Sequence, residues 1–208
     1  MSHDKHQAFF DQMAAEWDLM FTSVDMEFLS YIVDKLPVAQ GMDILDLGCG
    51  TGVLFDLLRR RVTDTGSIIG VDFSLEMTRL AHRNFPFANV NVVRTDALML
   101  PFADSTFDMA VVFAAFPHFT DQQKAIDEVH RVLKNKASFF IIHLDSSREI
   151  SEIHKKIGGV VENDEMPNSD KMREMFDSNR FINVTIEDRP GLYFASATNL
   201  KRSQIPKS

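Results

Sequence analysis

The sequence contains a single cysteine, Cys49, among its 208 residues. One cysteine excludes an internal disulfide, and it can supply neither a multi-thiolate zinc site nor a dithiol redox pair within one chain. Long apolar runs are also missing, since the longest, from Met109 to Phe116, falls far short of the roughly 18 residues that a membrane-spanning helix needs. The start of the chain lacks the apolar region of a signal peptide. These absences predict a cytoplasmic protein with no membrane span.

Positive charge is scarce as well. The chain has 22 Lys and Arg against 30 Asp and Glu, which gives a net charge of −8. This excess repels phosphate backbones and anionic membranes, so nucleic acid is not an expected partner. Hydrophobic residues make up 45% and charged residues 25%, which excludes a disordered or low-complexity chain. At about 150 residues per domain, the length predicts one domain.

Short apolar runs alternate with helical patterns from about residue 41 onward. We expect strands at 42–47, 67–72, 90–95, 107–113 and 137–144, and helices near 53–60, 75–84 and 121–134. This alternation predicts an α/β fold with a parallel sheet covered by helices on both faces. Further helical stretches at 148–157 and 170–179 precede two β-like runs at 181–188 and 192–198, which Arg189-Pro190-Gly191 joins as an antiparallel pair.

Two amphipathic helices are expected before the first strand. Apolar residues at helical spacing predict one helix over 9–21 and another over 28–36, with Thr22 and Asp25 as a cap for the second. We therefore divide one domain, 1–208, into parts: N-terminal helices at 1–40, a core at 41–145, a further segment with the last strands at 146–200, and a tail at 201–208.

A glycine-rich turn, G-x-G-x-G, follows the first expected strand. Its glycines, Gly48, Gly50 and Gly52, let a ligand approach the backbone closely. Asp72 ends the second expected strand, 20 residues after Gly52, where an acidic side chain accepts hydrogen bonds from ribose hydroxyls. Together these features predict a cofactor that contains a nucleoside.

The charge around the turn favours one cofactor. Dinucleotide-binding proteins use G-x-G-x-x-G to seat a pyrophosphate, and here the third glycine comes one residue early. Asp46, two residues before Gly48, would repel a pyrophosphate and attract an ammonium or sulfonium group. Asp96 follows the third expected strand, where a carboxylate can accept a hydrogen bond from the adenine amino group. This set favours S-adenosylmethionine, while a nicotinamide-dependent oxidoreductase remains an alternative.

Five motifs over residues 40–145 carry a family resemblance: LDLGCGTG, GVDFS, DALMLPF, Phe107-Asp108 and EVHRVLK. In order and spacing they resemble the class I S-adenosylmethionine-dependent methyltransferases, in the type 11 branch that includes ubiquinone and menaquinone biosynthesis methyltransferases. The first helix, FFDQMAAEWD, looks like the N-terminal lid of that family. The resemblance implies a Rossmann-like, seven-stranded, mostly parallel sheet with helices on both faces and an antiparallel C-terminal strand.

The resemblance also implies an activity and a binding site. The activity is methyl transfer from S-adenosyl-L-methionine to a small-molecule acceptor, with S-adenosyl-L-homocysteine as the product; a cofactor-binding protein without catalysis is the other alternative. The implied cofactor residues are Asp46, Gly48 and Gly50 at the methionine end, with Cys49 as a small filler between them, Asp72 at the ribose, Asp96 and Ala97 at the adenine, Phe73 and Met77 against its ring, and Phe113 and Ala114 near the reactive methyl.

Two histidines are candidate catalytic residues. His118 follows the fourth expected strand on the ligand edge, and His143 lies near the end of the fifth. We hypothesise that one of them assists deprotonation of the acceptor, although a structural role is open for both. A metal site is not expected, because no close spacing of His and carboxylates supports one.

The sequence narrows the choice of methyl acceptor only by excluding some acceptor classes. The stretch 113–117 lacks the Asn/Asp-Pro-Pro-aromatic motif of DNA amino-methyltransferases, and a single cysteine argues against arsenite-type acceptors. The remaining acceptor class is a small molecule with an aromatic or isoprenoid ring. We expect the segment 146–168 and the N-terminal lid to form its pocket. The protein is expected to be a monomer or a homodimer.

Overall fold

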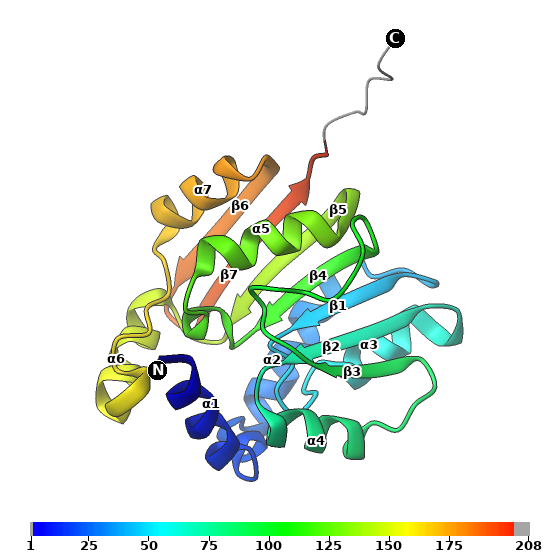
Figure 1. Ribbon diagram of the computed structural model, residues 1–208. Coiled ribbons are helices and arrows are strands. Elements are labelled where there is room, and N and C mark those ends of the chain that lie inside the picture. The colour runs from blue at the N-terminus through cyan, green and yellow to red at the C-terminus, as the bar shows by residue number, and fades with distance from the viewer. Residues whose placement is uncertain (1, 202–208) are drawn as a thin grey trace.

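The computed structural model describes residues 2–201 (Figure 1). Within this range, seven strands form one sheet in the order β3-β2-β1-β4-β5-β7-β6. The strands are β1 (Asp43–Leu47), β2 (Ser67–Asp72), β3 (Val90–Arg94), β4 (Phe107–Phe113), β5 (Leu133–His143), β6 (Phe181–Arg189) and β7 (Leu192–Asn199). β1 to β5 pair in parallel, and β7 runs antiparallel to both β5 and β6. The expected sheet is confirmed.

Helices cover both faces of this sheet. They are α1 (Ser2–Met13), α2 (Ser23–Lys35), α3 (Phe55–Val62), α4 (Leu75–Asn84), α5 (Gln122–Val132), α6 (Ser147–Ile157) and α7 (Ser169–Ser178), with short 3-10 helices η1 (Trp17–Met20), η2 (Thr63–Thr65), η3 (Phe116–His118) and η4 (Gly159–Val161). α5 and α7 lie on one face of the sheet, and α2 and α3 lie on the other (Figure 1). The buried side chains of these two pairs belong to two separate core clusters. No helix within residues 2–201 is long and apolar enough to cross a bilayer.

Strand β4 shows why the sequences of the central strands are almost continuously apolar. Ala110 and Val112 belong to the cluster with α5 and α7, while Met109 and Val111 belong to the cluster with α2 and α3. Successive side chains of a strand point to opposite faces, and here both faces are buried. All four side chains are fully buried.

The N-terminal helices differ in part from the expectation. The cap of α2 is confirmed as a capping box, since the side chains of Thr22 and Asp25 each accept a hydrogen bond from the backbone N–H of the other residue. The single helix expected over 9–21 is wrong, because α1 ends at Met13 and a turn leads into η1. Trp17 there packs its ring against Phe10, with ring centroids 5.8 Å apart. These tertiary contacts outweigh the helical spacing of the apolar residues.

The boundary between α5 and β5 also differs. We expected a helix to residue 134 and a strand from 137, but α5 ends at Val132 and β5 begins at Leu133. Lys136 takes a positive φ of 65°, and the register against β4 shifts at this point. The connection is therefore an irregular start of the strand. The tail expected at 201–208 lies, apart from Lys201, outside the described residues.

Candidate functional site

The glycine turn follows β1 at the carboxyl edge of the parallel strands. Gly48 and Gly50 have φ values of +74° and +53°, a region that side chains other than glycine rarely adopt. A Cβ on Gly48 would lie 2.4 Å from the Cβ of Ala115 in the loop after β4, so this position has no room for a side chain. The backbone N–H groups of Gly48 and Cys49 both donate to the carbonyl oxygen of Val71 in β2, which fixes the turn.

Asp46 is a buried carboxylate beneath this turn. Its side chain is 1% exposed, and neither of its oxygens has a hydrogen-bond partner among the described residues. Burial, together with the nearby charge of Asp72, raises the pKa of Asp46 to about 8. Buried carboxylates are normally paired, so this one is arranged for a partner that the polypeptide between residues 2 and 201 does not supply.

Asp72, at the end of β2, is better satisfied. Its carboxylate accepts hydrogen bonds from the backbone N–H of Gly50 at 3.0 Å and of Ser74 at 2.9 Å. Burial raises the pKa of Asp72 to about 6, and these hydrogen bonds act in the opposite direction. A carboxylate offers about four acceptor positions, so capacity remains for a ligand hydroxyl.

The N-terminal segment covers this edge and is fastened to it by two carboxylates. Asp11 of α1 accepts from the hydroxyl of Ser74 at 2.6 Å and from the backbone N–H of Glu76 at 3.1 Å, at the start of α4. Asp18 of η1 accepts from the hydroxyl of Thr51 in the glycine turn. The segment therefore lies as a lid directly on the elements that form the turn, as the resemblance implied.

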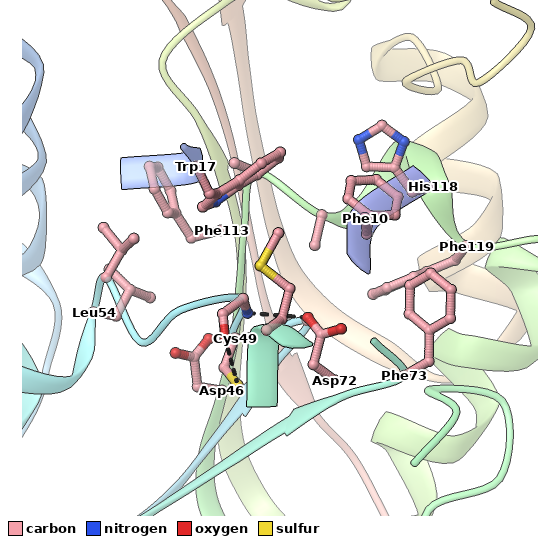
Figure 2. Close-up of a pocket in the computed structure, with 16 residues that line it drawn as sticks. Phe10, Trp17, Asp46, Cys49, Leu54, Asp72, Phe73, Phe113, His118 and Phe119 are labelled. Carbon is pink, nitrogen blue, oxygen red and sulfur yellow. Dashed lines mark hydrogen bonds between the residues drawn. The ribbon is translucent and has the colours of Figure 1, made fainter. Parts of the chain in front are cut away.

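These elements line a cavity that is partly open to solvent (Figure 2). A concave, mostly apolar site with a few polar groups is typical of small-molecule and cofactor sites. Most of the wall is apolar or aromatic, with the carboxylates at one end and His118 at the other. The lining residues are Phe10, Trp17, Asp46, Gly48, Cys49, Gly50, Val53, Leu54, Asp72, Phe73, Met77, Phe113, Ala114, Ala115, His118 and Phe119.

A second pocket adjoins the first along the end of β3. It shares Gly48, Asp72, Phe73, His118 and Phe119 with the cavity and adds Asp96 and Ala97 among its lining residues. All eleven residues expected at the cofactor therefore line one of these two spaces. The structure brings together positions from four different strand ends, spread over nearly 70 residues of sequence.

The two candidate histidines lie in different surroundings. His118 lines both spaces, whereas His143 is among the lining residues of neither. Burial, and then the charges of His118 and His154, lower the pKa of His143 to about 3, and its Nε2 has no hydrogen-bond partner among the described residues. The geometry favours His118 over His143 as a group that meets a ligand.

Several site residues were missed by reasoning from the sequence. Ala115 and Phe119 flank His118 in the loop after β4, and their position in sequence was an available signal. Asp11 and Asp18 were not singled out, because acidic residues are common on exposed helix faces. Asp164 hydrogen-bonds to His118 across 46 residues of sequence, and no local pattern marks it.

Comparison with known proteins shows the family of this chain. A family model described as a methyltransferase domain matches residues 45–141. The ubiquinone/menaquinone biosynthesis C-methyltransferase UbiE of Haemophilus ducreyi is 31% identical over 74% of this chain and 67% of its own length. The 2-phytyl-1,4-naphtoquinone methyltransferase of a Nostoc species is 32% identical over 67% of this chain. The chain matches 64% of the Nostoc protein, so it spans about two thirds of the length of these relatives.

Solved structures share the architecture. A Haloferax volcanii protein, solved in complex with the Trm112 methyltransferase activator, superposes with a TM-score of 0.77 at 19% identity, over 92% of this chain and 98% of that one. At this identity the likeness shows the fold alone. The matched domain holds the glycine turn, Asp46, Asp72 and Asp96 in the order that the motifs require. The chain belongs to the methyltransferase domain family, within the S-adenosylmethionine-dependent methyltransferases of the class I fold.

Proposed function

We propose that this protein transfers a methyl group from S-adenosyl-L-methionine to a small acceptor that carries an apolar ring. The observation that carries the proposal is the buried, unpartnered carboxylate of Asp46 beside the glycine turn. A cationic ligand stabilises the ionised form of this group, and the ionised form repels a pyrophosphate. When bound, the cofactor supplies a methyl group activated on a sulfonium, so the protein mainly has to hold and align the reactants.

Different residues of the site would bind different parts of the cofactor. Asp46, Gly48 and Gly50 would line the methionine end, Asp72 would hold the ribose hydroxyls, and Asp96 with the amide of Ala97 would hold the adenine. Phe73 and Met77 support the proposal, since they bury apolar surface against the space beside Asp72. Phe113 and Ala114, at the end of β4, would lie beside the methyl group.

The wall of the cavity supports the choice of acceptor. Phe10, Trp17, Phe113 and Phe119 line it, and aromatic side chains pack well against a ring in offset or edge arrangements. The Haemophilus and Nostoc relatives are named for quinone methylation, which is compatible with a ring acceptor. The lid from α1 and η1 would exclude water from the reacting groups.

We extend the proposal to the setting of the protein. We treat residues 1–208 as one methyltransferase domain acting as a monomer or a homodimer. The single cysteine supports a cytoplasmic location, because a reducing compartment does not call for disulfides.

Calorimetric titration with S-adenosylhomocysteine and, separately, with NADH tests the cofactor. We expect micromolar binding of the first, weakened by Asp72→Ala and unchanged by Asp64→Ala on the exposed surface. Selective binding of NADH would instead support an oxidoreductase.

Mass spectrometry of acceptors incubated with the methyl donor tests the reaction. The panel contains 1,4-naphthohydroquinone and simple phenols as ring acceptors, with farnesol and glycine as acceptors without an aromatic ring. We expect the mass gain of one methyl group on ring acceptors alone. Tight binding of S-adenosylhomocysteine without methylation of any acceptor would favour a binding protein without catalysis.

A further inference from the structure

Three histidines and one carboxylate meet where the lid closes over the cavity. His6 comes from α1, His118 from η3 and His154 from α6, and Asp164 lies in the loop between η4 and α7. We call these four residues the Asp164 cluster. No grouping of three or more His, Cys, Asp or Glu side chains in the described part of the chain is arranged to hold a metal ion. Hydrogen bonds hold the cluster together.

Asp164 binds its three neighbours at short distances. Its Oδ2 lies 2.7 Å from Nδ1 of His118, and both of its carboxylate oxygens lie 3.0 Å from Nε2 of His6. Its backbone carbonyl accepts a hydrogen bond from Nδ1 of His154 at 2.6 Å. Burial alone would raise the pKa of Asp164, but the hydrogen bonds from His118 and His6 hold it below its usual value. Asp164 is therefore ionised at neutral pH.

An ionised carboxylate fixes the tautomer of His118. A carboxylate only accepts hydrogen bonds, so Nδ1 of His118 carries the proton and Nε2 keeps a free lone pair. Among the described residues, the hydrogen bonds of this ring involve Nδ1 alone. Phe10 and His154 hold the ring from two sides, with ring centroids 4.9 Å away in each case. The ring is thus both oriented and ready to accept a proton.

His118 also occupies a distinctive place in the cavity. It lines the cavity of Figure 2, the adjoining pocket at Asp96, and an open groove bounded by Gln122 and Glu165. The other titratable groups of the cavity wall are Asp46, Cys49 and Asp72, which lie around the glycine turn. His118 is therefore the basic side chain among those lining residues, and it stands among aromatic rings at the opposite end.

The charge state of His118 agrees with this role. Burial lowers the pKa of the ring, against the hydrogen bond and charge of Asp164, and the neighbouring His154 and His6 lower it further. His143, at the end of β5, also interacts electrostatically with His118 and His154. The imidazole is neutral at neutral pH, so it is present as a base before the acceptor arrives.

We propose that His118, oriented by Asp164, is the proton acceptor for a phenol-class substrate, meaning a hydroxyl on an aromatic or equivalent conjugated ring. The inference rests on the proposed methyl transfer and names its acceptor chemistry. An aromatic ring suits the walls formed by Phe10 and Phe119, and a phenol needs a base before it attacks at neutral pH. His118 is the catalytic residue, and Asp164 is a positioning residue that acts through it.

The O–H bond of the phenol breaks and its proton goes to Nε2 of His118, which becomes an imidazolium stabilised by Asp164. An electron pair of the phenolate forms a new bond to the methyl carbon, either from oxygen or from the ring carbon beside it, while the bond between that carbon and the donor's sulfur breaks. The sulfonium becomes a neutral thioether, and the positive charge passes to the imidazolium. In the carbon case, the ring C–H proton moves to the oxygen to restore the aromatic ring.

para-Nitrophenol tests the proposal without any knowledge of the natural substrate. Its phenolate absorbs visible light and its phenol does not, so absorbance reports where the proton lies. The probe is titrated over pH in the presence of protein saturated with S-adenosylhomocysteine. We expect the bound probe to ionise at least one pH unit below the free probe, which is a tenfold change in its ionisation constant. His118→Gln should bind the probe and lose this shift.

Matched variants separate proton transfer from a structural role. Asp164→Asn should reduce the shift while His118 is still present, and Asp164→Glu should restore part of it. His82→Gln, on the exposed side of α4, serves as the control and should behave as the unaltered protein. Nitrogen NMR of the imidazole rings gives a second readout, since His118 should carry its proton on Nδ1 in the unaltered protein and lose this preference in Asp164→Asn.

Each outcome decides the matter. Failure of the probe to bind the S-adenosylhomocysteine complex, an unchanged ionisation when it binds, or an equal shift in His118→Gln overturns the proposal. With a phenol that is methylated, His118→Gln should lower kcat by about 10²- to 10⁴-fold, and an unchanged pH profile would also overturn it. Failure to bind S-adenosylhomocysteine at all would refute the proposed function itself, which is a separate result.

Discussion

Replacement of Asp46 by asparagine should stabilise the unliganded protein while weakening its binding of S-adenosylmethionine. In the unfolded chain this carboxyl has an ordinary pKa of 3.8, and in the folded protein burial raises it to about 8. The folded state therefore holds a proton that the unfolded state releases, so stability is lost as the pH rises from 3.8 toward 8. At about 1.4 kcal/mol per pH unit, the loss at neutral pH reaches about 4 kcal/mol as an upper value.

Asparagine keeps the shape of the protonated carboxyl and cannot ionise. We expect Asp46→Asn to raise the free energy of unfolding by about 2–4 kcal/mol at neutral pH and by almost nothing near pH 4. Urea denaturation of the unliganded protein between about pH 4 and pH 8 measures this difference. The exposed Asp64→Asn variant is the control and should show no such trend. A difference that stays constant with pH, or a variant that is less stable near pH 8, would refute the reasoning.

Three further substitutions test other parts of the structure. Gly48→Ala would place a Cβ 2.4 Å from that of Ala115, so urea denaturation should show a loss of about 1–3 kcal/mol and calorimetry a loss of S-adenosylhomocysteine binding; unchanged stability would contradict the close packing. Arg131→Lys removes a guanidinium that donates hydrogen bonds to Glu128 and to two backbone carbonyls of the loop after β3. Urea denaturation should show that the free energy of unfolding falls by about 1–2 kcal/mol. An unchanged free energy of unfolding would show that the positive charge alone is enough to hold the loop. His143 has a pKa of about 3 in the folded protein and 6.5 in the unfolded chain, so the protein loses stability as the pH falls below 6.5. His143→Gln should therefore move the midpoint of acid unfolding, followed by circular dichroism, to lower pH. An unchanged midpoint would argue against a buried neutral ring at this position.

The sheet was largely predictable because its strands are buried on both faces. β2 and β4 begin and end at the expected residues, since a mostly apolar run flanked by turn residues leaves little choice of boundary. The site followed from the same regularity. Parallel strands end at one edge of a sheet, so the sequence alone predicts that Asp46, Asp72 and Asp96 lie at the same edge.

What could not be predicted depends on contacts between distant segments. The break between α1 and η1 is set by Trp17 packing on Phe10 and by the Asp18 bond to Thr51, and no periodicity in the local sequence reports these partners. Asp164 lies in a loop without a motif, and only the folded chain brings it beside His118. Local pattern indicates which elements form, whereas the tertiary contacts decide where a helix ends and which charges meet.

The single thiol beneath the glycine turn makes the opening of this site measurable. Cys49 is 5% exposed, and burial, followed by the charges of Asp72 and Asp46, raises the pKa of its thiol well above the usual value. A thiol-specific reagent reacts with the thiolate, so modification has to wait for a fluctuation that uncovers the sulfur. Because the chain has no second cysteine to compete for the reagent, the rate of labelling reports how often the sulfur becomes accessible. A ligand that holds the turn closed should therefore lower the rate of labelling.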